Sequence, residues 1–265
     1  MQTEKVIDYM VEWLKEYLSR SGMKGLVVGV SGGVDSAVVS TLCAMTGYPV
    51  LCVEMPIHQA KDQVDRARDH VVQLKKRFPN LTDIQVDLTT TFETLKASMP
   101  KTEGSDLHFL TLANTRARLR MTTLYYFAGL HRFLVTGTGN KIEDFGVGFY
   151  TKYGDGGVDI SPVADLLKSE VYKIGAALNI SETILNAPPT DGLFGDSRTD
   201  EAQLGATYTE LEWAMEMAEK NKSETDFVGR ELEVFKLYEH LHSVNLHKMT
   251  PIPVCIIPTE FKILN

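Results

Sequence analysis

A glycine-rich segment with two serines and an aspartate is the part of the sequence best suited to chemistry. It reads GVSGGVDS over residues 29–36 and overlaps the apolar run GLVVGV at 25–30. Such a run is typical of a strand buried on both faces, and a helix is expected from about Val34 to Met45. At a strand-to-helix turn, glycine lets the backbone approach an anion, while free N–H groups and the helix dipole point toward it. The predicted phosphate site consists of Gly29, Val30, Ser31, Gly32, Gly33, Val34, Asp35 and Ser36.

Two common phosphate-binding patterns are absent from this segment. A Walker A loop has a lysine after its glycines, and the G-x-G-x-x-G fingerprint marks dinucleotide sites; neither is present here. The run S-G-G-x-D-S instead resembles the pyrophosphate loop of the ATP pyrophosphatases. These enzymes hold the β and γ phosphates of ATP as a unit and cleave at the α phosphate. The resemblance implies a reaction that leaves AMP on the substrate, whereas a tight turn without a ligand is the structural alternative.

Two carboxylates are expected beside the phosphates. Asp35 lies in the loop and Glu143 follows the fourth predicted strand. Both should therefore lie at the carboxyl edge of a parallel sheet, where ligand sites of α/β proteins form. Hard carboxylate oxygens near a triphosphate imply Mg²⁺. Taken alone, Glu143 in NKIED is more often a solvated acid at a helix start.

Four further motifs indicate which family the chain resembles. They are NTRAR at 114–118, GTGNKIE at 137–143, TKYGDGG at 151–157 and the pair His247-Lys248. In this order, across nearly the whole chain, they resemble the series that marks the NAD synthetases. The resemblance implies a reaction in two steps. Deamido-NAD reacts with ATP to give an adenylate and pyrophosphate, and ammonia then displaces AMP to give NAD.

The resemblance also implies roles for individual residues. The loop 29–36 should bind the pyrophosphate portion of ATP, and Asp35 and Glu143 should ligate Mg²⁺. Further ATP contacts are expected from Thr138, Lys168 and Thr190. Deamido-NAD is expected to contact Arg118, Lys152, Asp159, His247 and Lys248. The candidate catalytic residues are Asp35, Lys152 and Lys168, and the two lysines suit the negative charge that grows at the α phosphate.

The arginines in and just after the NTRAR motif lie on two different helix faces. Asn114 and Arg118 are four residues apart and share one face, while Arg116 and Arg120 share another. For Arg116 and Arg120, a solvated face or a salt-bridge partner is the favoured explanation.

Other positions depart from the family pattern or have a simpler explanation. His247 and Lys248 also suit the C-terminal end of a helix, where positive charge complements the dipole. Glu54 stands near the end of the second strand, where some relatives carry a basic residue, so no adenine contact is assigned to it. Other members have a histidine and alanines within GTGNKIE, which leaves the roles of Asn140 and Lys141 open.

The elements around these motifs predict a doubly wound α/β fold with a parallel sheet and extra C-terminal helices, and the family resemblance implies a fold like that of the adenine nucleotide alpha hydrolases. Apolar runs alternate with helical patterns, which is typical of βαβ units with right-handed crossovers. A single domain over 1–265 is expected. Strands are expected at 25–30, 49–56, 83–88 and 132–137. Helices are expected from the N-terminus to about 21, then at 34–45, 60–78, 106–128, 166–178, 200–219 and 225–242.

Two segments rich in Gly, Ser, Thr and Asp are candidate lids. They cover residues 98–106 and 190–200. Ordinary surface loops are the alternative explanation for both.

Composition narrows the class of protein. The chain has 265 residues with 43% hydrophobic and 23% charged residues, which is ordinary for a globular protein. Its net charge of −8 argues against a nucleic-acid partner, and the N-terminal helical pattern fits neither a signal peptide nor a membrane span. A cytoplasmic location is expected. Cys43, Cys52 and Cys255 form no C-x-x-C pair and are expected to be packing residues.

Other enzymes and one non-enzymatic class share parts of this pattern. Enzymes that thiolate tRNA or form lysidine have a similar loop, but the former generally need cysteines and a tRNA partner favours a basic surface. The synthetase portion of GMP synthetase is another relative of the loop. A nucleotide sensor or an electron-transfer flavoprotein-like module would not need the carboxylate pair. An assay for AMP formed from ATP, Mg²⁺ and deamido-NAD separates a ligase from such a module.

Two further expectations concern partners. The family resemblance implies a homodimer with the dinucleotide pocket at the interface, and Leu124, Tyr125, Tyr126 and Phe127 on the helix 106–128 are the expected contact. Burial in the chain's own core is the alternative for this aromatic run. Glutamine-using relatives carry an additional amidase domain, for which the 265 residues leave no room, so ammonia is expected to come from solution.

Overall fold

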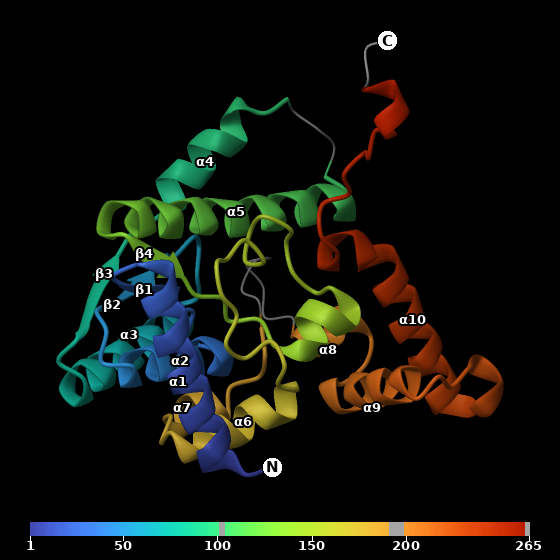
Figure 1. Ribbon diagram of the computed structural model, residues 1–265, viewed down its shortest axis with the longest axis horizontal. Coiled ribbons are helices and arrows are strands. Elements are labelled where there is room, and N and C mark those ends of the chain that lie inside the picture. Colours follow the sequence, from blue (N-terminus) through green and yellow to red (C-terminus); the bar gives the residue numbers. More distant parts are fainter. Residues whose placement is uncertain (101–103, 191–198, 263–265) are drawn as a thin grey trace.

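A four-stranded parallel sheet lies between two layers of helices (Figure 1). The computed structural model describes residues 1–100, 104–190 and 199–262. The strand order is β3-β2-β1-β4, with Leu26 of β1 opposite Val50 of β2 and Leu134 of β4. The strands are β1 (Gly25–Gly29), β2 (Val50–Glu54), β3 (Leu81–Gln85) and β4 (Phe133–Val135).

Helices cover both faces of the sheet, as the predicted doubly wound fold requires. Because side chains of a strand alternate between faces, Leu26 and Val28 of β1 pack with the helices on one side, and Val27 packs with those on the other. The first side carries α1 (Thr3–Ser21), α2 (Val34–Met45), α3 (Lys61–Arg77), α6 (Lys168–Ala177) and α7 (Glu182–Leu185). The second side carries α4 (Thr89–Ser98) and α5 (Asp106–His131).

The C-terminal helices form a separate apolar cluster beside the sheet, which confirms the predicted extra helical portion. Its largest fully buried side chain is Phe235, and a π-helical turn after β4 contributes Ile142 to the same cluster. The elements are η1 (Ile142–Val147), α8 (Asp200–Leu204), α9 (Tyr208–Glu219), η2 (Glu224–Asp226) and α10 (Gly229–Met249).

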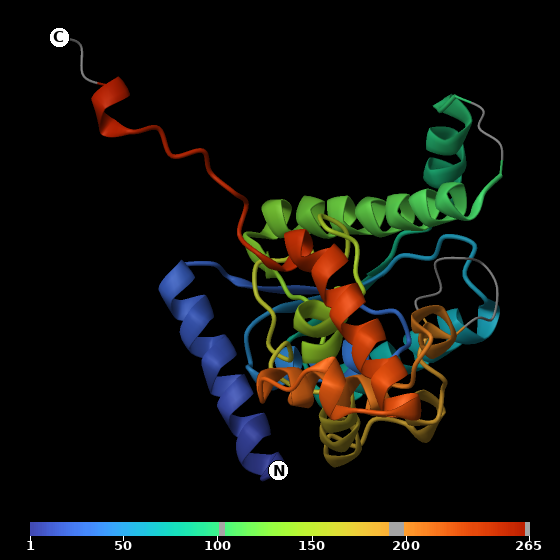
Figure 2. The same ribbon diagram turned by 90° about the vertical axis from the view of Figure 1, so that its right-hand side faces the viewer.

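The residues after α10 form an extended arm that stands away from the body of the molecule (Figure 2). The arm contains a short turn, η3 (Thr259–Phe261), and exposes apolar side chains such as Ile256 and Phe261. Cys255 is exposed on it, so the prediction that all three cysteines pack in the interior is wrong for this one. None of the described helices has the combined length and apolar character that a membrane span requires.

Several predicted boundaries were wrong for physical reasons. β3 begins at Leu81, two residues before the predicted start, because Leu81 pairs with Val50 and packs in the core. α5 continues through Gly129 to His131, beyond the predicted end at residue 128, because Phe127 and Ala128 anchor its last turn in the core. Helix α4 was not predicted.

The predicted C-terminal helices also differ from those observed. The helix expected at 200–219 is divided, since Gly205 adopts a positive φ and Thr207 caps the start of α9. The helix expected at 225–242 begins at Gly229 and ends at Met249. Of the two candidate lids, residues 101–103 and 191–198 lie outside the described residues.

Candidate active site

The loop between β1 and α2 has the geometry of an anion site. Gly32 adopts a φ of +85°, and a Cβ there would lie 2.6 Å from the carbonyl oxygen of Gln63, so only glycine fits. The Ser31 N–H donates to Ser36 Oγ at 3.2 Å, and Ser36 Oγ donates to the Gly33 carbonyl at 3.0 Å. These bonds close the loop on itself. Gly33 supplies no side-chain cap to α2, so the first N–H groups of the helix are available to an anion.

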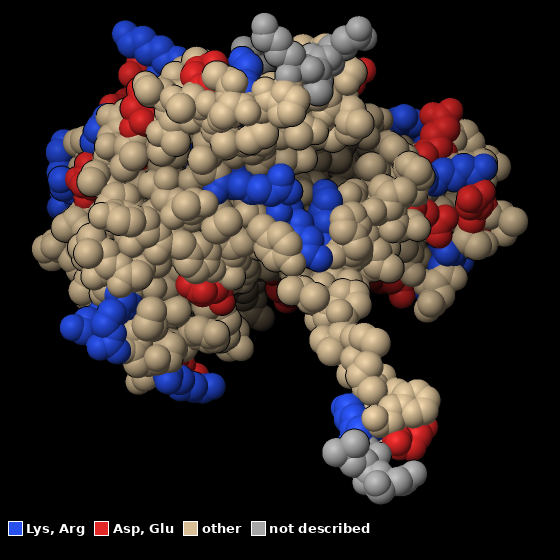
Figure 3. All heavy atoms as spheres, turned by 90° about the horizontal axis from the view of Figure 1, so that it is seen from above, with Lys and Arg blue, Asp and Glu red and all other residues tan. Residues whose placement is uncertain are grey.

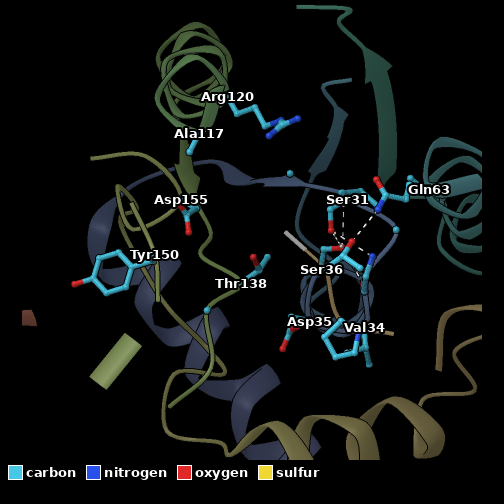
Figure 4. A pocket seen from close by; sticks show the side chains of 18 of the residues that line it. Ser31, Val34, Asp35, Ser36, Gln63, Ala117, Arg120, Thr138, Tyr150 and Asp155 are labelled. Atoms are coloured by element: carbon cyan, nitrogen blue, oxygen red, sulfur yellow. Dashed lines mark hydrogen bonds between the residues drawn. The ribbon is translucent and has the colours of Figure 1, made fainter. Parts of the chain in front are cut away.

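This loop forms one wall of a cavity of about 290 Å³. The end of β2, α3, α5, the segment after β4 and the start of α6 form the other walls. Thr138 lines the cavity, as does Thr190, whose hydroxyl accepts a 2.8 Å bond from Gln63 Nε2 on α3. Figure 4 shows Arg120, Thr138 and Asp155 entering this space from different elements. The position of the cavity, at the carboxyl ends of β1 and β2, is where ligands bind in open α/β sheets.

A buried cluster of charges lies beside the loop. Lys168 Nζ lies 2.5 Å from Asp35 Oδ2 and 3.1 Å from Glu143 Oε1. Asn140 Nδ2 donates to Asp35 Oδ1 at 3.2 Å, and the Tyr208 hydroxyl donates to Glu143 Oε1 at 2.6 Å. The structure therefore brings together the aspartate of the loop, the glutamate after β4 and the first residue of α6.

The pKa shifts in the cluster follow from burial and from the ion pairs. Burial alone would lower the pKa of Lys168, but the adjacent Asp35 and Glu143 carboxylates raise it overall, so the ammonium stays charged. Burial raises the pKa of Asp35 in spite of Lys168. The pKa of Glu143 is lowered, because Lys168 and the Tyr208 hydroxyl outweigh its burial. Burial, with Glu143 as the next cause, also raises the pKa of Tyr208, which keeps its phenol protonated as a donor.

Two more acids border this region and line the cavity. Burial raises the pKa of Asp144 to about 8, with the neighbouring Glu143 as the next cause. Burial also raises the pKa of Asp155, which accepts a bond from the Thr151 N–H at 3.0 Å. Both acids therefore hold a proton more readily than an ordinary aspartate.

The Asp35 and Glu143 carboxylates fit a shared Mg²⁺ ion. Both approach the same ammonium, so their oxygens lie close enough together to share one cation. Mg²⁺ is commonly held by one or two carboxylates, with substrate phosphates and water as its other ligands. The described part of the chain contains no group of three or more His, Cys, Asp or Glu side chains that could hold a metal ion by themselves.

Four of the five residues expected to contact deamido-NAD lie at the junction of α5, the segment after η1, and α10. Arg118 Nη2 donates to the Lys152 carbonyl at 3.3 Å, and the Lys152 ammonium donates to the carbonyl of His247. Lys248 Nζ donates to the carbonyls of Gly148 and Tyr150 at 2.8 and 2.9 Å. On the face that carries α5, Lys and Arg side chains gather near the base of the C-terminal arm (Figure 3).

The fifth residue lies elsewhere. The carboxylate of Asp159 accepts bonds from the Val135 N–H at 2.8 Å and from the Tyr125 hydroxyl at 3.0 Å. These contacts tie the segment after the TKYGDGG motif to β4 and α5. Asn114 also ties the TKYGDGG motif to α5, since its Oδ1 accepts a 2.7 Å bond from the Thr151 hydroxyl.

The solvated face favoured for Arg120 from the sequence is wrong, whereas the explanation favoured for Arg116 is not tested. Arg120 lines the cavity and donates to the Met55 carbonyl at 3.0 Å and to Gln59 Oε1 at 2.8 Å. The guanidinium of Arg116 lies 4.6 Å from the centre of the Phe92 ring. Arg120 therefore belongs to a wall of the cavity, and Arg116 packs against α4.

Three residues of the site had no assigned role or were not singled out in the sequence. Asn140 is fully buried and bonds to both Asp35 and the Glu143 N–H. Its place between Thr138 and Glu143 in the GTGNKIE motif was the available signal. Tyr208 lies 65 residues from Glu143 along the chain, and no local pattern connects them. Glu54 is buried at the end of β2, 3.2 Å from Arg68.

The parallel sheet, the loop and the carboxylate pair define an α/β nucleotide-binding protein of the ATP pyrophosphatase class. Comparison with known proteins identifies the family. The sequence model of the NAD synthase family matches residues 6–251, and the chain therefore belongs to this family of enzymes. It is 36% identical to the NH₃-dependent NAD⁺ synthetase of Mesoplasma florum, over 99% of each chain.

Two more comparisons extend this result. The chain is 37% identical to the NH₃-dependent NAD⁺ synthetase of Syntrophomonas wolfei, over 99% of this chain and the whole of the relative. The solved structure of an NMN synthetase from Francisella tularensis superimposes with a TM-score of 0.81 at 27% identity, over 97% of this chain and 99% of that one. The likeness covers nearly the full length in each case, including the C-terminal helices.

Proposed function

We propose that this chain catalyses the ATP-dependent amidation of deamido-NAD with ammonia, giving NAD, AMP and pyrophosphate through an adenylated intermediate. The observation that carries the proposal is the arrangement of one cavity. The pyrophosphate loop 29–36 lies on one side of it, and the buried Lys168, Asp35 and Glu143 cluster lies beside the loop. Membership of the NAD synthase family supports this assignment.

In the first step, the nicotinate carboxylate attacks the α phosphorus of ATP and the bond to the β-phosphate oxygen breaks. The backbone N–H groups of the loop hold the departing pyrophosphate. Lys168, Thr138 and Thr190 are the proposed side-chain contacts to ATP. Asp35 and Glu143 are the proposed ligands of Mg²⁺, which supplies positive charge to the phosphates when bound.

In the second step, the lone pair of ammonia attacks the acyl carbon, AMP leaves and the new amide loses a proton. Arg118, Lys152, His247 and Lys248 are proposed to hold deamido-NAD, with the two lysine ammoniums and the guanidinium suited to its phosphates. Asp159 is proposed to contact the same substrate. It lies in the segment after the TKYGDGG motif, which its bond to the Val135 N–H ties to β4.

An isotope experiment tests the adenylated intermediate directly. Deamido-NAD labelled with ¹⁸O in the nicotinate carboxylate is incubated with the protein, ATP, Mg²⁺ and ammonium. Attack of the carboxylate on the α phosphorus transfers one ¹⁸O atom into AMP, which mass spectrometry detects. Unlabelled AMP, or label in inorganic phosphate together with ADP, contradicts the proposal.

A second candidate reaction follows from the comparison with the NMN synthetase, which covers nearly both chains. The same chemistry applied to nicotinate mononucleotide would give nicotinamide mononucleotide, because the carboxylate that reacts is identical. A ratio of kcat/KM values for the two acids, measured at saturating Mg-ATP, separates the candidates. We expect deamido-NAD to be preferred, because the basic residues around Lys152 and Lys248 offer contacts for a second phosphate.

We also propose that the chain acts as one domain and as a homodimer. On α5, Phe127 packs in the core, whereas Tyr126 is 65% exposed and Leu130 is 62% exposed. Apolar side chains on the C-terminal arm are exposed as well. Exposed apolar surface of this kind is typical of an interface. Analytical ultracentrifugation of wild type and a Tyr126→Glu variant tests the dimer, and a wild-type monomer at micromolar concentration rejects it.

A further inference from the structure

Lys168 occupies the space between the two carboxylates proposed to bind the metal. Its ammonium contacts Asp35 Oδ2 and Glu143 Oε1 simultaneously. Asp35 Oδ1 accepts from Asn140, and Glu143 Oε1 also accepts from Tyr208. Three of the four carboxylate oxygens therefore already accept a hydrogen bond or pair with the ammonium.

The position of this ammonium is well defined by its surroundings. The Lys168 side chain is 5% exposed and begins at the first residue of α6. Its Nζ also lies 4.9 Å from the centre of the Tyr208 ring. A buried ammonium needs anionic partners, because burial without them is strongly unfavourable. Lys168 can therefore leave the carboxylates only if another anion replaces them.

From this geometry we infer that Lys168 and a divalent cation compete for Asp35 and Glu143. The triphosphate of ATP ends this competition in favour of the cation, because it offers the Lys168 ammonium another anionic partner. A cation held by both carboxylates beside the ammonium would place three positive charges within a few ångströms of one another, which is unfavourable at low dielectric. The phosphates of ATP offer the ammonium a new partner across the same cavity. Lys168 then changes partner, and the metal enters with the nucleotide rather than before it. This inference rests on the proposed ATP and Mg²⁺ sites.

The test measures metal binding without turnover. Free Mn²⁺ is followed by electron paramagnetic resonance during titration of wild type, Lys168→Met and the control Lys141→Met. Lys141 also lies near Glu143 in the chain, but its ammonium pairs with Glu219, so its loss changes the net charge equally without vacating the carboxylates. We expect Lys168→Met to bind Mn²⁺ at least tenfold more tightly than wild type, and Lys141→Met to resemble wild type. Equal affinities of all three proteins, or equal gains in both variants, overturn the inference.

A measurement on the wild type alone tests the order of binding, even if Lys168→Met fails to fold. A ligand that binds the native state raises the unfolding temperature. We expect millimolar Mg²⁺ alone to leave the temperature unchanged, and to raise it clearly when α,β-methylene-ATP is present, beyond the effect of the analogue alone. An equal rise with and without the analogue overturns the inference. Neither readout depends on NAD formation, so failure of the proposed function and failure of this exchange are distinguishable.

Discussion

The hydroxyl of Tyr208 donates a 2.6 Å hydrogen bond to Glu143 Oε1, and this bond joins α9 to the turn that carries the proposed metal ligand. The raised pKa of Tyr208 keeps the phenol protonated, so it remains a donor at neutral pH. Tyr208 thus holds one oxygen of Glu143 in place.

Tyr208→Phe should impair the reaction without unfolding the protein. Loss of a hydrogen bond to a charged group weakens an interaction by about 1.5–3 kcal/mol. We expect kcat/KM for Mg-ATP to fall roughly tenfold to a hundredfold, which is that free energy expressed as a rate ratio. Steady-state kinetics at varied Mg²⁺, with circular dichroism as the folding control, measure the effect. Wild-type kinetics would show that Glu143 needs no support from α9.

Asp35→Asn should abolish most adenylation, because an amide oxygen is a poorer ligand of Mg²⁺ than a carboxylate. The expected loss in kcat is on the order of a hundredfold or more. Pyrophosphate release in the presence of deamido-NAD is the readout. Asp62→Asn serves as the matched control, because Asp62 is an exposed acid that pairs with Arg66 one helical turn away. Full activity of Asp35→Asn at high Mg²⁺ rejects the metal role.

Lys152→Ala should mainly weaken the binding of deamido-NAD. Its ammonium contacts the His247 carbonyl in the group that includes Arg118. We expect KM for deamido-NAD to rise about tenfold, as for the loss of a charge-assisted contact, with little change in KM for ATP. Lys220→Ala is the control, since Lys220 pairs with Glu216 on the exposed surface of α9. Unchanged kinetics of the variant for both substrates would show that Lys152 is an ordinary surface charge with no role in the reaction.

The sequence predicts the parts of this molecule that depend on local patterns. The four strands and the loop 29–36 follow from apolar runs and from glycines at a strand end. Helix α4 was missed because its threonines are weak helix formers, and the burial of Phe92 stabilises it instead. Gly129 suggested a helix end, but packing of the preceding turn outweighs a penalty of about 1 kcal/mol.

The site was predictable where family motifs mark it and not where contacts cross the fold. Asp35, Glu143 and Lys168 belong to three separate segments, and the structure brings their side chains together. The role of Arg120 was misjudged because its position relative to the cavity depends on how α5 lies on the sheet. Mg²⁺, the dimer and the cytoplasmic location remain predictions.

A buried histidine should make the fold sensitive to acid. His70 Nε2 lies 2.9 Å from Ser40 Oγ, and burial, with Arg77 as the next cause, lowers the pKa of His70 to about 4. The unfolded chain binds this proton with a pKa of about 6.5. The unfolded state therefore holds more protons between these values, and stability falls as pH falls from about 6.5 toward 4.

The loss of folding stability caused by His70 should approach about 2–3 kcal/mol by pH 4.5, because each pKa unit corresponds to about 1.4 kcal/mol. Urea unfolding of wild type and His70→Gln at pH 7.5 and pH 4.5 measures it. Glutamine retains a polar group for Ser40 but does not titrate. We therefore expect the variant to lose less stability than the wild type between pH 7.5 and pH 4.5. Parallel losses in both proteins would mean that His70 is not the acid-sensitive group.

The nitrogen source should leave a signature in the pH profile. The attacking species needs a free lone pair, and ammonium, like a lysine ammonium with a pKa of about 10, is mostly protonated at neutral pH. The usable fraction climbs roughly tenfold per pH unit below that value. With deamido-NAD and Mg-ATP saturating, kcat/KM for total ammonium should rise steeply from pH 7 to 9.

The same data recalculated for free NH₃ should be nearly flat, because the lone pair then comes from solution and no protein base is required. A flat profile for total ammonium would instead indicate a base that deprotonates bound ammonium. Asp159 is a poor candidate for that role, since both of its carboxylate oxygens already accept bonds, Oδ2 from the Val135 N–H and Oδ1 from the Tyr125 hydroxyl. Asp155 is the better one, because it lines the cavity and burial raises its pKa. An Asp155→Asn variant whose profile becomes steep where the wild type is flat would identify that base. Efficient turnover with glutamine alone, in a preparation free of any amidase, would refute ammonia as the direct substrate.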